Sequence, residues 1–209
     1  MEFSTWVAFF AASWAISLSP GAGAIAAMSS GLNHGFRRGY FTTFGLILGI
    51  LTQILLVGAG LGALIATSSI GFALVKYLGV AYLVYLGVQQ WRAPATPMVA
   101  SNSNAALVTR RQLVLRGWGI NAVNPKGTVF LLAVVPQFLD LKADLTQQYL
   151  VIAATLGFTD LVVMAGYTAL AARVLSALRS SHHIKIMNRT FGALFIAAGA
   201  LLATFKRSA

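Results

Sequence analysis

The 209-residue sequence contains no cysteine and little charge. Without cysteine there are no disulfides, no thiolate metal sites and no thiol chemistry. Only 9% of the residues are charged, whereas soluble domains carry about 25%. The net charge of +11 is not gathered into a basic arm that follows phosphates, because the basic residues are scattered over short segments between apolar runs. This distribution excludes an ordinary soluble domain and argues against a nucleic-acid partner.

Apolar residues make up 58% of the chain, and the mean hydropathy is +0.79. These values predict an integral membrane protein. The length allows about six spans of roughly 20 residues. The only charged residue before Arg37 is Glu2, whereas a signal peptide begins with a positively charged region. We therefore expect the first apolar run to remain in the protein as a span.

The apolar runs predict an all-α fold of six transmembrane helices. Three lie in residues 1–91 and three in residues 118–209, with a cytoplasmic linker over 92–117. The expected spans are about 4–28, 40–66, 71–91, 118–139, 149–172 and 190–205. A polar connection over 29–39 is expected to separate the first two.

Charge and span number together predict the topology. Ten basic residues follow spans one, three and five, and three lie on the opposite side, so both termini are expected outside the cytoplasm. Because each half has an odd number of spans, the second half enters the membrane from the opposite side. The result is a 3+3 inverted repeat, an arrangement that transporters use for alternating access.

Two helix-breaking stretches, 17–24 and 124–127, lie about half the chain apart, in spans one and four. Proline has no N–H for a helix, and its ring clashes with the carbonyl four residues back. A helix broken at membrane depth is tolerated only where it faces protein or a water-filled cavity. Paired interruptions of this kind point to a transporter's binding site. The residues expected to form that site at the breaks are Ser19, Pro20, Gly21, Gly23, Asn124 and Pro125.

Asp160 is the only carboxylate inside an apolar span, and an intramembrane acid is a functional hypothesis by default. Lys126 is expected at a depth that lets the two side chains meet. Burial disfavours both charges and pairing preserves them, so either group is suited to proton exchange, with a fixed structural ion pair as the alternative. For Lys76, near a span end, an interfacial position and a place in the pathway both stay open.

Other polar groups allow two interpretations. The half-helix after Pro20 presents N–H groups suited to a carboxylate, while Ser17, Ser19 and Asn124 either bind substrate or satisfy carbonyls freed by proline. Gln53 either lines a cavity or bridges helices. We expect no metal or cofactor, because His182 and His183 have no acidic or cysteine neighbours.

Five further segments are distinctive: LSPGAGA at 18–24, KYLGVAYLVYLG at 76–87, NPK at 124–126, PQF at 136–138 and NRTFG at 188–192. Together, and in this order, they resemble the LysE/RhtB family of amino-acid exporters. Ala22 departs from the pattern, since the family often has proline or serine there. The resemblance implies an inner-membrane carrier that exports small neutral amino acids or their lactones, driven by proton entry.

We therefore predict a secondary exporter with an amino acid, protons and the lipid bilayer as partners. No phosphate-binding loop for ATP is present. With no cysteine and no intramembrane histidine, we predict no enzymatic activity. A structural or regulatory membrane subunit is the alternative. Gly45 and Gly49 share a helix face that permits close packing, either within one chain or between two copies in a homodimer.

Overall fold

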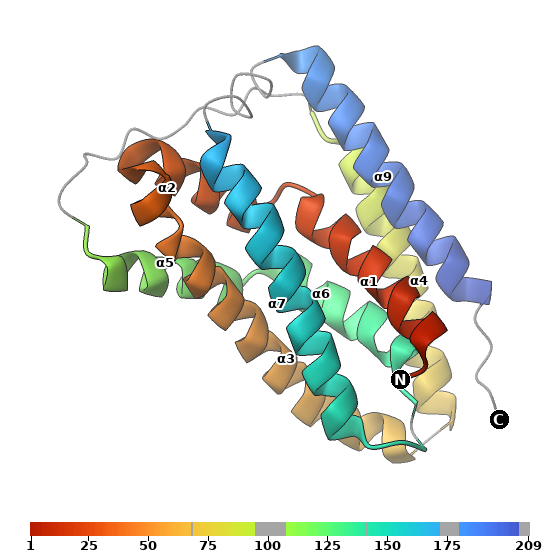
Figure 1. Ribbon diagram of the computed structural model, residues 1–209. Helices are drawn as coiled ribbons and strands as arrows, with labels where there is room; N and C mark the ends of the chain where they lie inside the picture. Colours follow the sequence, from red (N-terminus) through yellow and green to blue (C-terminus); the bar gives the residue numbers. More distant parts are fainter. Residues whose placement is uncertain (68, 95–107, 141, 172–179, 205–209) are drawn as a thin grey trace.

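The computed structural model describes residues 1–67, 69–94, 108–140, 142–171 and 180–204, and every regular element in these ranges is helical (Figure 1). The elements are α1 (Phe3–Leu18), α2 (Ala22–Gly39), α3 (Phe41–Thr67), α4 (Ser69–Arg92), α5 (Arg110–Ala122), α6 (Pro125–Val134), the 3₁₀ turn η1 (Val135–Phe138), α7 (Leu145–Ala169) and α9 (Ser181–Thr204). The predicted all-α class is confirmed.

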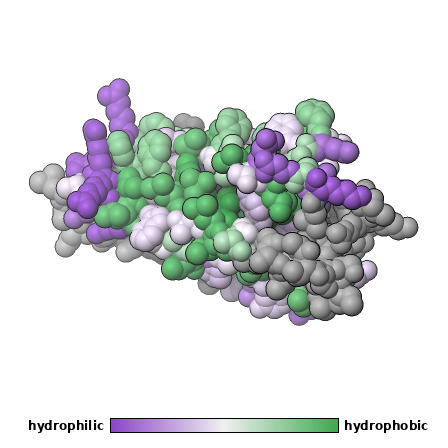
Figure 2. Space-filling model, turned by 90° about the horizontal axis from the view of Figure 1, so that it is seen from below, coloured by the Kyte–Doolittle hydropathy of each residue, from purple (hydrophilic) through white to green (hydrophobic). Residues whose placement is uncertain are grey.

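Length and apolarity suit several of these helices to a bilayer. In the described residues, α7 and the Phe41–Ala59 part of α3 are each long and apolar enough to cross a membrane. Helices α1 and α2 qualify together as one bent pair, with 56° between them. Figure 2 shows apolar side chains across the middle of one face, with hydrophilic side chains toward its ends. This distribution is typical of a membrane protein.

The first predicted break lies between α1 and α2. Helix α1 ends at Leu18, and its last cap bond runs from the Ser19 N–H to the Ala15 carbonyl. Pro20 has no N–H to continue this series. Gly21 then takes an extended conformation before α2 begins. The chain therefore bends where the sequence predicts.

The second break separates α5 from α6. Helix α5 ends at Ala122, and the Asn124 side chain accepts a hydrogen bond from the Lys126 N–H, at 3.1 Å. Pro125 is the first residue of α6, where its missing N–H costs no helical bond. The proline therefore starts a helix here, after the asparagine that caps it.

Two helices are longer than the sequence indicates. Residues 29–39, predicted as a polar connection, continue α2, which kinks at Gly35 (φ 69°). The fold-back brings Thr42 Oγ1 to Ser30 Oγ, at 2.8 Å. Helix α5 begins at Arg110, inside the predicted linker, because a capping box at Thr109 closes its first turn. Linker residues 95–107, residues 172–179 and the C-terminal Lys206 and Arg207 lie outside the described part of the chain.

Glycines let two pairs of helices approach at backbone distance. A Cβ on Gly49 of α3 would lie 2.6 Å from the Asn121 Cβ of α5. A Cβ on Gly87 of α4 would lie 2.8 Å from the Gly192 carbonyl of α9. The predicted packing role of Gly45 and Gly49 is confirmed within one chain, since both face α5.

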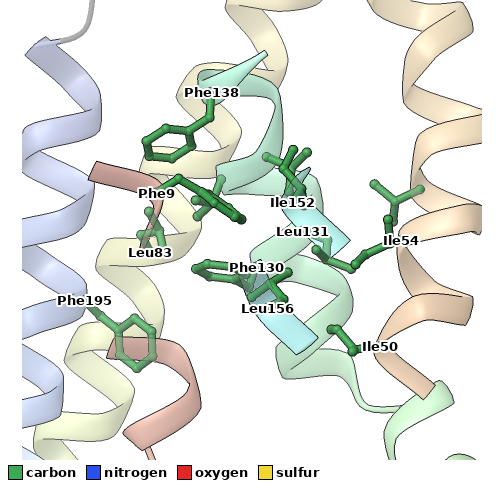
Figure 3. Packing of buried hydrophobic residues seen from close by; sticks show 13 residues of the cluster. Phe9, Ile50, Ile54, Leu83, Phe130, Leu131, Phe138, Ile152, Leu156 and Phe195 are labelled. Carbon is green, nitrogen blue, oxygen red and sulfur yellow. The ribbon is translucent and has the colours of Figure 1, made fainter. Parts of the chain in front are cut away.

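The largest buried cluster joins α1, α3, α4, α6, α7 and α9 (Figure 3). Phe9 of α1 and Phe138 of η1 meet edge to face, with ring centroids 5.3 Å apart. Phe130 and Leu156 also belong to this cluster. Because their side chains reach the cavity between the breaks, the core fixes the position of the site.

Candidate functional site

A cavity of about 70 Å³ lies between the two helix breaks. This volume has room for a few water-sized groups. The predicted site residues that line it are Ser19, Gly21, Gly23, Asn124, Lys126 and Asp160. Pro20 and Pro125 are absent from the lining; they end and start the helices that carry it. Its apolar wall consists of Ile16, Ala24, Leu46, Ile50, Phe130, Leu156 and Met164.

Lys126 connects the two breaks. From the first turn of α6, its Nζ donates to the Ser19 carbonyl at 2.8 Å and to Ser19 Oγ at 2.7 Å. Nζ also lies 5.7 Å from the centre of the Phe195 ring. Ser19 caps α1, and a cation at the C-terminus of a helix is stabilised by the helix dipole. The ammonium group therefore compensates the broken end of α1.

Asp160 is held by the same break from the opposite side. Its Oδ1 accepts a hydrogen bond from Ser17 Oγ at 2.7 Å, and Ser17 Oγ lies 3.2 Å from Thr159 Oγ1. No ion pair joins Asp160 to Lys126 in the residues that the structure describes. The fixed ion pair considered from the sequence is thus not observed. Each charged group bonds a serine of the break instead.

The break exposes different groups on its two sides. On the α1 side, the Leu18 carbonyl accepts from Tyr167 Oη at 2.7 Å, and the Ser19 carbonyl accepts from Lys126. On the α2 side, Gly21 provides no side-chain cap for the helix N-terminus. Gly21 and Gly23 both line the cavity. The carbonyls are therefore satisfied by other helices, while the positive end of α2 faces the cavity.

Gln53 supports the second break from α3. Its Nε2 donates to the carbonyls of Asn121 at 2.6 Å and Asn124 at 3.0 Å. The side-chain amide of Asn121 donates in turn to the Leu46 carbonyl of α3, at 2.6 Å. Of the two sequence interpretations of Gln53, the bridge between helices is confirmed. The side chain of Lys76 lies outside the described part of the structure.

Sequence reasoning missed Asn121, Thr159 and Tyr167. Tyr167 had a detectable signal, because it follows Asp160 by seven residues and two helical turns return a side chain to the same face. Thr159 is adjacent to the acid and resembles many buried threonines. Asn121 lies one turn before the predicted break, but nothing in the sequence indicates that its amide reaches α3.

Comparison with known proteins covers nearly the whole chain. Residues 14–205 match the family described as LysE type translocator. The chain is 39% identical over 208 residues to the homoserine/homoserine lactone efflux protein of Salmonella typhi, with 100% of both chains covered. It is 42% identical over 208 residues to an "Uncharacterized membrane protein" of Vibrio cholerae, covering 99% of this chain and 100% of the relative. It is 31% identical over 212 residues to the leucine efflux protein of Enterobacter sp. (strain 638), covering 98% and 96%. No solved structure matches the chain.

Proposed function

Because the chain belongs to the LysE family of translocators, we propose that it is a secondary exporter of small neutral amino acids. Relatives named for efflux of homoserine and its lactone, and of leucine, support this class of cargo. Homoserine, homoserine lactone and threonine are the first substrates to test. We propose transport without an enzymatic reaction, consistent with a family of translocators.

The observation that carries the proposal is the cavity between the two breaks. Its wall includes one acid, Asp160, and one lysine, Lys126. Placing charged side chains at membrane depth is energetically unfavourable, and such side chains commonly mark substrate or ion pathways. A cavity that combines them with the uncapped start of α2 has the groups needed to hold a polar solute inside an apolar protein.

We propose six spans, with α1 and α2 forming the first and α5 and α6 the fourth. Contacts along the helices support these directions. Residue numbers rise together along α1 and α7, and likewise along α3 and α5, so each pair runs parallel. The contacts that set these directions are Trp6 with Thr155, Ser17 with Asp160, Gly49 with Asn121, and Gln53 with Asn124.

Helices α4 and α9 run antiparallel, because Gly87 meets Gly192 while Gly199 meets Val80. Six successive membrane crossings require spans one and five to run parallel, and spans two and four as well. They also require spans three and six to run antiparallel. We propose that the halves form a 3+3 inverted repeat, with the cavity between their broken helices. Both termini then lie on the periplasmic side of the bacterial inner membrane.

Transport by alternating access follows from this arrangement. The two halves rock about the cavity, which opens to one side of the membrane at a time. Asp160 binds the substrate ammonium group and a proton in turn, so that proton entry drives export. Lys126 tunes the charge of Asp160 across the cavity. The Gly45 and Gly49 face is used within the chain, so a homodimer requires another surface.

A structural or regulatory membrane subunit is the competing function. Such a subunit needs no charged groups around an internal cavity. Lys126 and Asp160 therefore favour the exporter. The two functions also differ in a direct observable, since only the exporter moves solute when it is the sole protein in a membrane.

Radiolabelled homoserine counterflow in proteoliposomes tests the proposal. Measurements with and without an imposed pH gradient, using unlabelled amino acids as competitors, identify both coupling and cargo. We expect exchange that the gradient stimulates and that a few small neutral compounds inhibit. Folded protein that moves no compound of the panel would support the subunit.

A further inference from the structure

We propose that the cavity recognises both charged ends of a zwitterionic α-amino acid. Lys126 and the start of α2 receive the carboxylate, and Asp160 receives the ammonium group. The inference rests on the proposed export function and names the substrate class of the same site. It predicts that free amino acids depend on Lys126, whereas esters and lactones, which have no carboxylate, do not.

The carboxylate end is defined by Gly21 and Lys126. A Cβ on Gly21 would lie 3.6 Å from Lys126 Cδ and 3.7 Å from Nζ, so the ammonium group lies beside the residue that directly precedes α2. Its bonds to Ser19 are to neutral oxygens, and no acid of the described chain pairs with it. The uncapped N-terminus of α2 lies at the same wall. A cation and a helix N-terminus both favour an anion at this point.

The ammonium end is defined by Asp160 and Ser17. One hydrogen bond from Ser17 occupies only part of the carboxylate, which accepts about four hydrogen bonds. The remaining capacity suits the three N–H donors of a substrate ammonium group. Ser17 therefore positions Asp160 without neutralising it.

The two charged ends lie near each other, as recognition of one α-amino acid requires, because their serine partners are close in the chain and both ends line the same cavity. Ser17 and Ser19 are two residues apart, so their Cα atoms are separated by at most about 7 Å. In an α-amino acid both charged groups are attached to the same carbon. We propose that a charge-assisted hydrogen bond, typically about 2.7–2.9 Å long, forms at each end.

The rest of the wall determines which side chains fit. Beyond Lys126 and Asp160, no charged residue lines the described cavity. Phe130 and Leu156 are buried and apolar where they reach it. A substrate side chain with a third charge therefore lacks a partner, which restricts the cargo to small neutral amino acids.

Binding measured by calorimetry on the purified full chain in detergent tests the inference directly. The probes are homoserine against homoserine lactone, and threonine against threonine methyl ester, at mildly acidic pH where every amine is charged. We expect Lys126→Met to weaken binding of the free amino acids by about 10-fold to 100-fold and to change the lactone and ester by less than about 3-fold. Ser17→Ala weakens both classes alike, because both carry the ammonium group. Equal losses for both classes in Lys126→Met, or no binding of free amino acids to the wild type, would overturn the inference.

A matched pair of glycine variants provides the second test, should Lys126→Met not fold. Gly21→Ala places a methyl group beside Lys126 at ordinary van der Waals distance. Gly23→Ala places one 3.6 Å from Leu46 instead. We expect Gly21→Ala alone to lower the preference for free amino acids over esters. An unchanged preference in Gly21→Ala would contradict the assigned carboxylate position.

Counterflow with the same variants separates this inference from the proposed function. The expected binding pattern without any transport would refute the exporter and leave the recognition mode intact. Transport in the wild type, with equal losses for both probe classes in Lys126→Met, would refute the recognition mode and leave the exporter intact.

Discussion

Lys126 and Ser19 are separated by 107 residues, and two hydrogen bonds from one ammonium group join them across the two helix breaks. The pair connects the broken end of α1 to the first turn of α6. Any motion that separates the two breaks has to separate these groups as well. Rocking of the two halves in the proposed transport cycle therefore acts on this contact.

Ser19→Ala tests that connection, because it removes the bond from Lys126 to Ser19 Oγ and keeps the bond from Lys126 to the Ser19 carbonyl. We expect transport to fall by about 10-fold to 100-fold, because the loss of one hydrogen bond to a charged group amounts to about 1.5–3 kcal/mol. Ser13→Ala is the control, since Ser13 is equally buried in α1 but bonds only the Phe9 carbonyl of its own helix. Initial counterflow rates of the two variants compare them. Similar rates in both would remove the Lys126–Ser19 pair from the transport cycle.

Gln53→Leu is expected to destabilise the fold more than it alters substrate preference. The substitution removes the bonds that the Asn121 and Asn124 carbonyls accept from α3, at a cost of about 1 kcal/mol for each bond, while both carbonyls keep backbone donors. The free energy of unfolding in mixed micelles measures the effect. Gln89→Leu, at an exposed position of α4, serves as the control. If both variants unfold alike, the α5–α6 break does not depend on Gln53.

Tyr167→Phe removes a single donor from the first break. The Leu18 carbonyl then loses its bond from α7, and we expect stability to drop by about 1 kcal/mol. Tyr85→Phe is the control, because that exposed hydroxyl contacts only Gln89 on its own helix, at 3.4 Å. Thermal unfolding in detergent compares the two. A loss in Tyr167→Phe no greater than that in Tyr85→Phe would show that the Leu18 carbonyl does not depend on Tyr167.

Two glycines of neighbouring helices are expected to respond oppositely to alanine. Gly49→Ala forces a Cβ to within 2.8 Å of the Ala122 backbone nitrogen, so α3 and α5 have to separate, at a cost of about 1–3 kcal/mol. Gly119→Ala meets open space and gains helix propensity of up to about 1 kcal/mol. Unfolding in a denaturing detergent should show that Gly119→Ala is more stable than the wild type and that Gly49→Ala is less stable. Equal tolerance at both positions would contradict the close approach of these helices.

The sequence predicted the helical class and the two breaks, because proline and glycine act on the backbone within a few residues. It also identified the charged residues of the cavity, since an isolated acid in an apolar run is visible without a structure. It did not reveal that Asp160 bonds Ser17 while Lys126 bonds Ser19. These partners lie more than a hundred residues away, and their pairing depends on how α1, α6 and α7 pack. The helical extension over 29–39 was missed because its polar composition resembles a loop, whereas the fold-back at Gly35 packs it against the following helix.

Gradient-driven homoserine export by Asp160→Asn in proteoliposomes directly tests whether this carboxylate couples transport to protons. Asp144→Asn is the matched control, because this exposed acid only caps α7 and asparagine caps a helix equally well. We expect Asp160→Asn to abolish stimulation by the pH gradient, while Asp144→Asn behaves as the wild type. Full gradient-driven export by folded Asp160→Asn protein would contradict the role assigned to this carboxylate.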